Sequence, residues 1–202
     1  MLQMQSYSEL VIKAKKLLEE HYKDKNPKRL AHIYGVAEMA ELLAKRYGID
    51  ENKAKIAALM HDYSKYDDFD NLKNLLSKED QEECEKYPFL YHAYLSAIFF
   101  KKLVLDDDEI YNAIRYHVFG RPNMNMLEAI IMISDFTEKN RTYDDCIRCR
   151  HILVDDNDID LAIYESLKAT RNVCLRDGNP LHPLQEKVLK EYEEKIRSRK
   201  WL

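Results

Sequence analysis

Most histidines of this sequence stand where a metal-dependent reaction could use them. The seven histidines fall mainly on, or at the ends of, stretches that read as buried helices, although histidine generally prefers intermediate exposure. Two aspartates join four of them in a candidate ligand set: His32, His61, Asp62, His92, His117 and Asp135. Imidazole and carboxylate suit divalent iron, manganese, cobalt and zinc. The set could therefore hold two ions, with one carboxylate bridging between them.

The same histidines and aspartates also have a simpler interpretation. A lone His-Asp pair carries little weight, because chance readily produces one in a chain of this composition. A single buried histidine is also more often a hydrogen-bonded core residue than a metal ligand. Only the joint placement of several such groups favours a metal site.

Helical periodicity runs along the whole chain, and no stretch alternates as a strand would. Ser6 and Glu9 form a capping box for a helix that runs to about Tyr22. Asn26-Pro27 starts the clearest helix, which carries His32 and ends at Gly48.

The remaining ligand candidates fall on later helices. We expect a buried helix from Asp50 into the His61-Asp62 pair and a polar, loosely helical stretch over 67–86. Further helices are predicted from Pro88 to Leu103, from the 106–108 acidic run to near His117, over 126–139, from 157 to about Arg176 and from Pro183 to about Arg199. The sequence therefore predicts one all-α helical bundle over residues 1–202, with a buried metal centre in a core at about 27–141 and C-terminal helices at about 157–199.

The composition excludes several classes of protein. With 46% hydrophobic and 34% charged residues, no long apolar run and a mean hydropathy of −0.57, the chain fits neither a disordered segment nor a membrane span. Only 4 glycines and 5 prolines argue against a turn-rich β fold. A net charge of −4 has the wrong sign for binding a nucleic-acid polymer, so a small anionic ligand would need a local basic pocket.

The N-terminus and the cysteines point to a reducing compartment. No basic and apolar leader is visible at the start of the sequence, so we expect a cytoplasmic protein. The four cysteines are then expected to be thiols. Cys146 and Cys149 form a CxxC pair, but no second pair is present to complete a structural zinc site.

The order His32, His61-Asp62, Asp135 resembles the H…HD…D signature of the HD-domain metal-dependent phosphohydrolases. His92 and His117 match the extra pair of the two-metal members. The chain is similar in particular to the YqeK-type branch, the symmetrical bis(5'-nucleosyl)-tetraphosphatases, over the stretches 27–50, 57–65, 109–141 and 178–183. IRYHVFGRP and LEAIIMISD are the segments most typical of that branch.

The resemblance implies a role for each ligand candidate. His32, His61, Asp62 and Asp135 would hold one ion, and Asp62 would bridge to a second ion held by His92 and His117. Iron is the metal that the family suggests, with manganese, cobalt or zinc as alternatives. The paired ions would aim a hydroxide at phosphorus and neutralise charge on the phosphoryl oxygens, which makes Asp62 and His61 catalytic residues.

Lys65 is predicted to act beside them in catalysis and in binding substrate. It follows Asp62 by three residues and His61 by four, which places it on the same side if the helix continues that far, and its ammonium could reach a phosphate oxygen. A solvated lysine at a helix end is the alternative.

The other expected substrate contacts flank the metal segments. Arginines could clamp a polyphosphate through bidentate hydrogen bonds, although at least one is expected to be a plain surface charge, and the resemblance places the C-terminal His-Pro near the nucleotide. The expected contacts are Arg29, His32, Arg115, Tyr116, His117, Arg121, Asp135, Arg141, Leu181, His182 and Pro183.

The chain departs from the family pattern at several points. Glu138-Lys139-Asn140-Arg141 stands where the family has Glu-Pro-x-Arg, and Tyr143 to Cys146 replace Phe-Pro-Gly-Val. His92-Ala93 replaces His-Gly, and 67–88 matches poorly. These departures concern the loop after the last metal aspartate and the cover over the substrate.

We therefore expect an enzyme that splits diadenosine tetraphosphate into two ADP. The C-terminal helices would complete the nucleotide pocket, and a homodimer is possible. One alternative is an HD-type phosphatase acting on nucleoside mono- or diphosphates. The other is a nucleotide-binding sensor without turnover, although such a module would have no physical need for the full ligand set.

Overall fold

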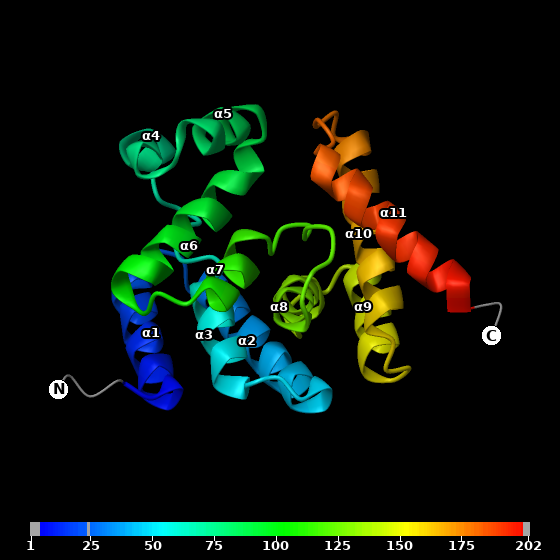
Figure 1. Cartoon of the computed structure of the whole chain (residues 1–202), viewed down its shortest axis with the longest axis horizontal. Coiled ribbons are helices and arrows are strands. Elements are labelled where there is room, and N and C mark those ends of the chain that lie inside the picture. Colours follow the sequence, from blue (N-terminus) through cyan, green and yellow to red (C-terminus); the bar gives the residue numbers. More distant parts are fainter. Residues whose placement is uncertain (1–4, 24, 200–202) are drawn as a thin grey trace.

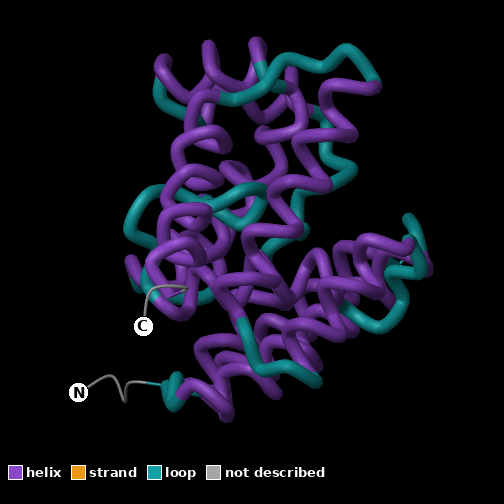
Figure 2. The backbone as a smooth tube through the Cα atoms, turned by 90° about the vertical axis from the view of Figure 1, so that its right-hand side faces the viewer, coloured by secondary structure: helices purple, strands orange, loops and turns teal. Residues whose placement is uncertain are grey.

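The computed structural model describes residues 5–23 and 25–199. Within those ranges the backbone consists of helices, loops and turns, without a strand (Figure 2). The predicted all-α class is confirmed. None of the described helices is both long and apolar enough to cross a membrane.

Eleven α-helices and two short 3-10 helices follow one another along the described part of the chain. They are α1 (Tyr7–Tyr22), α2 (Pro27–Tyr47), α3 (Glu51–Met60), α4 (Phe69–Leu72), η1 (Lys73–Leu75), α5 (Lys78–Lys86), η2 (Pro88–Leu90), α6 (Tyr91–Leu103), α7 (Asp108–Arg115), α8 (Met126–Thr137), α9 (Asp144–Val154), α10 (Ile159–Arg176) and α11 (Pro183–Arg199).

The helix ends confirm the caps that were read from the sequence. Ser6 and Glu9 make a complete capping box at the start of α1. The Asn26 side chain accepts the first free amides of α2, which ends on Gly48 in the left-handed conformation, with φ 68°. These caps fix where α2 begins, and hence which of its residues face the core.

The core is built around α2, α3 and α8. Helix α2 packs against both α3 and α8, and α8 also packs against α7. The apolar run at the end of α3 is buried on every face, as predicted from its lack of a polar face. In Figure 1, α8 is seen end-on between the N-terminal helices and a C-terminal group formed by α9, α10 and α11.

Helix α9 was not predicted from the sequence. It begins with Asp144 and Asp145 at the positive end of the helix dipole and buries Cys146, Cys149 and Leu153 at helical spacing. In the sequence this segment stands out for its CxxC pair and for its departure from the family loop. These two features obscure its helical periodicity. The Cys146 and Cys149 thiols are free, and burial raises their pKa, that of Cys149 to about 12, so they remain unreactive thiols.

Candidate metal centre

Five segments bring the six predicted ligands together in the interior. His32 comes from α2 and Asp135 from α8, while the His61-Asp62 pair follows α3. His92 lies in the first turn of α6, and His117 comes just after α7. The four histidines and Asp62 are buried. Ligands that are distant in the sequence thus meet in one cluster through the packing of α2, α3, α6, α7 and α8.

The two carboxylate oxygens of Asp62 face different histidines. Oδ2 lies 3.6 Å from Nε2 of His61 and 3.9 Å from Nε2 of His32. Oδ1 lies 3.1 Å from Nε2 of His92 and 3.8 Å from Nε2 of His117. This arrangement suits a carboxylate that bridges two cations, one on each side.

Asp135 completes one side of the cluster. Its Oδ1 lies 2.9 Å from Nε2 of His32 and 3.9 Å from Nε2 of His61. On the other side, the Nε2 atoms of His92 and His117 approach each other to 3.3 Å. Three overlapping groups result, each with its ligand atoms within 4.8 Å of one another: His32, His61 and Asp62; His61, His117 and Asp135; Asp62, His92 and His117.

Hydrogen bonds set the tautomer of three of the four histidines. His61 donates from Nδ1 to the Ala58 carbonyl at 2.6 Å, and His117 donates from Nδ1 to the Ile114 carbonyl at 2.8 Å. Nδ1 of His32 donates to Oε1 of Glu138 at 3.1 Å. Since the outer nitrogen carries the proton in each case, Nε2 is the atom left to bind a metal.

Several of these inward atoms lack a hydrogen-bond partner of suitable geometry. They are Nε2 of His32, Nε2 of His61 and Oδ1 of Asp62, all of them buried. An unsatisfied buried polar atom is rare in proteins because it loses the hydrogen bonds that water provided. Their convergence on one space fits a divalent metal site made of nitrogen and oxygen ligands.

The ionisation of His92, His117 and Asp62 also suits a metal, whereas at His32 burial is outweighed by the Asp135 and Glu138 carboxylates, which raise the pKa of the ring. Burial lowers the pKa of His92 and of His117 to about 4, so both rings are neutral near pH 7. Burial opposes ionisation of Asp62, but His61, Lys65 and His92 outweigh it and hold the pKa of Asp62 well below its usual range. Neutral imidazole and ionised carboxylate are the metal-binding forms of these side chains.

Three cationic side chains border the cluster. Arg29 Nη1 lies 2.7 Å from Oδ2 of Asp62, and Arg141 Nη2 lies 2.9 Å from Oδ1 of Asp135. Lys65 Nζ lies 3.0 Å from Nε2 of His92 and 3.8 Å from Oδ1 of Asp62. The predicted positions of Arg29, Arg141 and Lys65 beside the cluster therefore agree with the structure.

A bracing network lies behind His32. Glu138 is buried, and its Oε2 accepts both the backbone amide of Asn140 at 2.7 Å and the Asn140 side chain at 2.9 Å. On the neighbouring turn of α2, a Cβ added at Gly35 would lie 2.1 Å from that same Oε2. Only glycine lets the carboxylate approach this closely, which explains a glycine in the middle of a helix.

Arg150 on α9 secures the loop that carries Glu138. Its guanidinium donates to the carbonyls of Thr137 at 2.6 Å, Glu138 at 2.5 Å and Arg141 at 2.7 Å. Glu138 and Arg150 were not predicted as site residues. The Glu-x-x-Arg part of the family motif could have identified Glu138, whereas Arg150 carried no signal because its helix was missed.

Two of the predicted arginines lie elsewhere. Arg115 makes a bidentate ion pair with Asp80 at 2.6 and 3.1 Å and stacks on Tyr94, with 3.8 Å from its guanidinium carbon to the ring centroid. Arg121 forms a bidentate pair with the buried Glu128 at 2.7 and 2.9 Å. Both are engaged in holding helices together.

Tyr116 lines a small cavity together with Arg115, apart from the cluster. The Leu181-His182-Pro183 segment forms the start of α11. His182 is buried, donates from Nε2 to Oε1 of Glu83 at 2.9 Å, and accepts the Leu184 amide on Nδ1 at 3.1 Å. None of these residues is among those lining the two cavities that adjoin the cluster.

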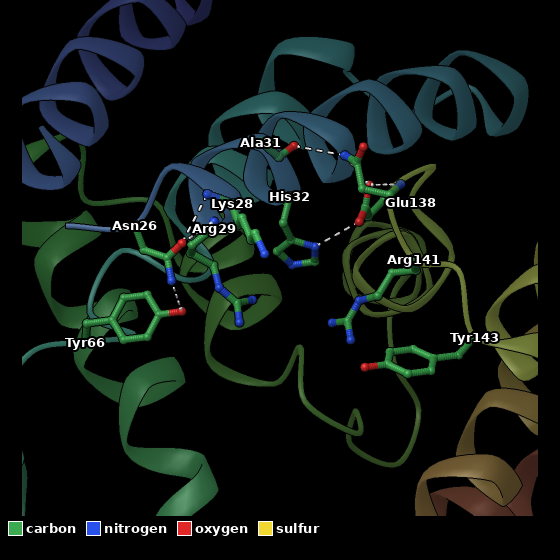
Figure 3. Close-up of a pocket in the computed structure, with 10 residues that line it drawn as sticks. Asn26, Lys28, Arg29, Ala31, His32, Tyr66, Glu138, Arg141 and Tyr143 are labelled. Atoms are coloured by element: carbon green, nitrogen blue, oxygen red, sulfur yellow. Dashed lines mark hydrogen bonds and ion pairs between the residues drawn. The ribbon is translucent and has the colours of Figure 1, made fainter. Parts of the chain in front are cut away.

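Those two cavities lie on different sides of the ligand set. One of about 550 Å³ opens beside His92, His117 and Lys65 and has an apolar wall that includes Phe89 and Val173. The other, of about 500 Å³, opens beside His32 at the N-terminal end of α2 (Figure 3). Arg141 and Tyr143 line both cavities, so the two spaces meet beside Asp135.

Comparison with known proteins agrees with this geometry. The family model described as the HD domain matches residues 29–158. A crystal structure described as a predicted HD superfamily hydrolase involved in NAD metabolism, from Clostridium acetobutylicum, superimposes with a TM-score of 0.78 at 30% identity, covering 95% of this chain and 99% of that one.

Curated relatives carry a more specific name. The Bacillus subtilis protein named symmetrical bis(5'-nucleosyl)-tetraphosphatase is 33% identical over 158 residues, which cover 77% of this chain and 84% of the relative. The protein of the same name from Halalkalibacterium halodurans is 36% identical over 174 residues, with coverage of 85% and 90%. The resemblance seen in the motifs is confirmed, and the chain belongs to the HD-domain family of hydrolases, in the branch that contains the symmetrical bis(5'-nucleosyl)-tetraphosphatases.

Proposed function

We propose that this protein hydrolyses diadenosine tetraphosphate symmetrically, giving two molecules of ADP. The observation that carries the proposal is Asp62, whose two oxygens face two separate histidine pairs, together with two nucleotide-sized cavities that adjoin these histidines on either side and meet beside Asp135. The names of the curated relatives support the same substrate and the same cleavage.

The reaction adds one water across the central phosphoanhydride bond. The water oxygen bonds to one of the two inner phosphorus atoms, the bond from that phosphorus to the bridging oxygen breaks, and the bridging oxygen leaves with the other ADP half. A bound pair of divalent metals would supply Lewis acidity for activating water and for neutralising charge on the phosphoryl oxygens. We propose His32, His61, Asp62 and Asp135 as the holders of one ion, and Asp62, His92 and His117 as the holders of the other.

The remaining residues position the polyphosphate. Arg29 and Arg141 already lie within 3 Å of the cluster carboxylates, so their guanidinium groups reach the space where phosphate oxygens must sit. Lys65 is half-buried beside His92 and can donate to a phosphate oxygen on that side. Iron is the metal we propose, on the strength of the family resemblance, with manganese as a working substitute.

The first experiment is product analysis. Protein purified anaerobically with iron or manganese is given diadenosine tetraphosphate, and the products are separated by anion-exchange chromatography, with AMP and ADP as parallel substrates. ADP as sole product is the expected result. AMP plus ATP would contradict the symmetric cleavage, and phosphate released from AMP or ADP alone would contradict the dinucleotide substrate.

A further inference from the structure

The cavity beside His32 adjoins the ligand set and differs in its lining from the larger cavity. Three cations line each of them, Lys28, Arg29 and Arg141 here and Lys65, Arg141 and Arg176 in the larger cavity, but only the larger cavity has an apolar wall. The volume of the cavity beside His32, about 500 Å³, is close to the 550 Å³ of the larger one. Each space is of the size that a nucleoside diphosphate needs.

We infer that the cavity beside His32 is a second nucleoside-diphosphate subsite, which holds the ADP half of the substrate that the larger cavity does not. The inference rests on the proposed function, because it assumes a dinucleoside polyphosphate substrate. It adds a binding location for the second nucleoside. It also identifies the residues that would favour a substrate with two nucleosides over a substrate with one.

The ligand set lies between the two cavities. Symmetric cleavage requires the central phosphoanhydride to lie at the ligand set, with a stretch of substrate of equal length on either side. Asp62 turns Oδ2 toward His32, which lines this cavity, and Oδ1 toward His92 and His117, which line the other. A chain of phosphates that crosses the ligand set beside Asp135, where the two spaces meet, therefore leads from one cavity into the other.

Three cationic side chains line the cavity beside His32. The side chains of Arg29 and Arg141 extend past the His32 ring into the same space from opposite walls (Figure 3). Lys28 adds a third positive charge on the outer side, where it is exposed to solvent. The carboxylate in the wall, Glu138, is directed at His32 and Asn140, so its hydrogen-bonding capacity is already used. Arg29 and Arg141 are paired with carboxylates of the ligand set, so an incoming phosphate would use their remaining donors together with the ammonium of Lys28.

Two exposed aromatic rings line the cavity beside His32. Tyr66 is 47% exposed and Tyr143 is 73% exposed, and they stand at opposite ends of the cavity (Figure 3). The Tyr66 hydroxyl accepts a hydrogen bond from the Asn26 side chain at 3.0 Å, and the Arg29 guanidinium carbon lies 5.9 Å from the Tyr66 ring centroid. An exposed ring that is held in place in this way offers a stacking surface for a base at little loss of entropy.

The test compares two substrates that differ only in their second nucleoside. Diadenosine tetraphosphate and adenosine 5'-tetraphosphate both carry four phosphates, but only the first has a base for this subsite. The double variant Tyr66→Ala, Lys28→Ala should lower kcat/KM for diadenosine tetraphosphate more than it lowers kcat/KM for adenosine 5'-tetraphosphate. We expect the two losses to differ by roughly tenfold, which corresponds to the loss of one stack between a base and an aromatic ring. Most of that difference should appear in KM.

Two controls belong to this test. Lys16→Ala removes an equally exposed lysine from α1, far from the cavity, and should leave both substrates unaffected. Tyr66→Phe keeps the ring and should recover most of the selectivity. Because Tyr66 and Lys28 are not core residues, circular dichroism should show an intact fold.

ADP binding gives a second readout that does not depend on turnover. Calorimetric titration of the manganese-loaded protein with ADP should give two sites per chain, and one site in the double variant. A single site in the unchanged protein, or equal losses for both substrates in the variant, would overturn the subsite while leaving symmetric hydrolysis intact. Failure of the unchanged protein to form ADP from diadenosine tetraphosphate would instead overturn the proposed function.

Discussion

The two sides of the metal centre are built differently. His32, His61 and Asp135 come from α2, α3 and α8, which pack directly against one another in the core. His92 and His117 come from α6 and from the loop after α7. Helix α6 packs chiefly against α7, which packs in turn against α8 and α3. The first side is part of the central packing, whereas the second is attached to it through α7 and through Asp62.

The hydrogen bonds behind the ligands differ in the same way. His32 is braced by Glu138, which is itself fixed by Asn140 and by Arg150 from the next helix. On the second side His117 is held by a carbonyl of its own segment, and His92 by the neighbouring Lys65. We therefore expect changes on the first side to affect the orientation of ligands from a distance, and changes on the second side to act locally.

Asp62→Asn should have the largest effect because it alone serves both sides. Loss of the bridging charge weakens both ion sites, so we expect turnover to fall at least about a thousandfold and metal content to fall below one ion per chain. The fold should be retained, since asparagine has nearly the same shape. Metal analysis, steady-state kinetics and circular dichroism measure these effects. Hydrolysis at the unchanged rate would contradict the two-ion assignment.

His117→Ala should separate the two sides. Only the second ion loses a ligand, so we expect about one metal per chain and a loss of turnover of roughly a hundredfold, with the first site still occupied. The exposed His151, replaced by alanine, is the matched control and should keep two ions. If His117→Ala emptied both sites equally, the two sides would not be independent.

Gly35→Ala should damage the first side without touching a ligand. The added methyl group displaces the Glu138 carboxylate and with it the Nδ1 partner of His32, so we expect metal affinity to fall about 10- to 100-fold. Alanine normally stabilises a helix interior by about 0.5–1 kcal/mol relative to glycine, so a lowered melting temperature would itself indicate the clash. Unchanged metal affinity together with a raised melting temperature would show that Glu138 does not brace His32.

Arg115→Ala should have the smallest effect on the metal centre. Removing its pair with Asp80 and its stack on Tyr94 loosens the contact of α5 with α6 and α7, and we expect a loss of about 1–2 kcal/mol in the free energy of unfolding. Chemical denaturation measures this loss. Metal content should stay at the wild-type level, and KM for the substrate should change less than about twofold. A large rise in KM would restore the substrate-binding role that the sequence suggested for Arg115.

The sequence was most informative where local rules are strong. The caps at Ser6, Asn26 and Gly48 define helix ends through hydrogen bonds within a few residues, and these could be read directly. The six ligands could be named because their types and their order match a known signature. The fold class followed from helical periodicity and from the scarcity of glycine and proline.

What could not be predicted depends on contacts between distant segments. Arg115 and Arg121 look like phosphate ligands in sequence, but their partners Asp80 and Glu128 are revealed only by packing. The reason for Gly35 lies in a carboxylate about a hundred residues further along the chain, on another segment. Such pairings are set by tertiary structure, which periodicity and spacing do not encode.

The hydrogen bond between His182 and Glu83 joins residues 99 positions apart. During synthesis all six ligands leave the ribosome before residue 182 does, so the metal centre can assemble on a nascent chain while the region around Glu83 still lacks its partner on α11. Closing so long a loop is entropically unfavourable and comes late in folding. We therefore expect a chain that is stopped before His182 to bind metal while α5 is held only by its contacts with α6 and α7.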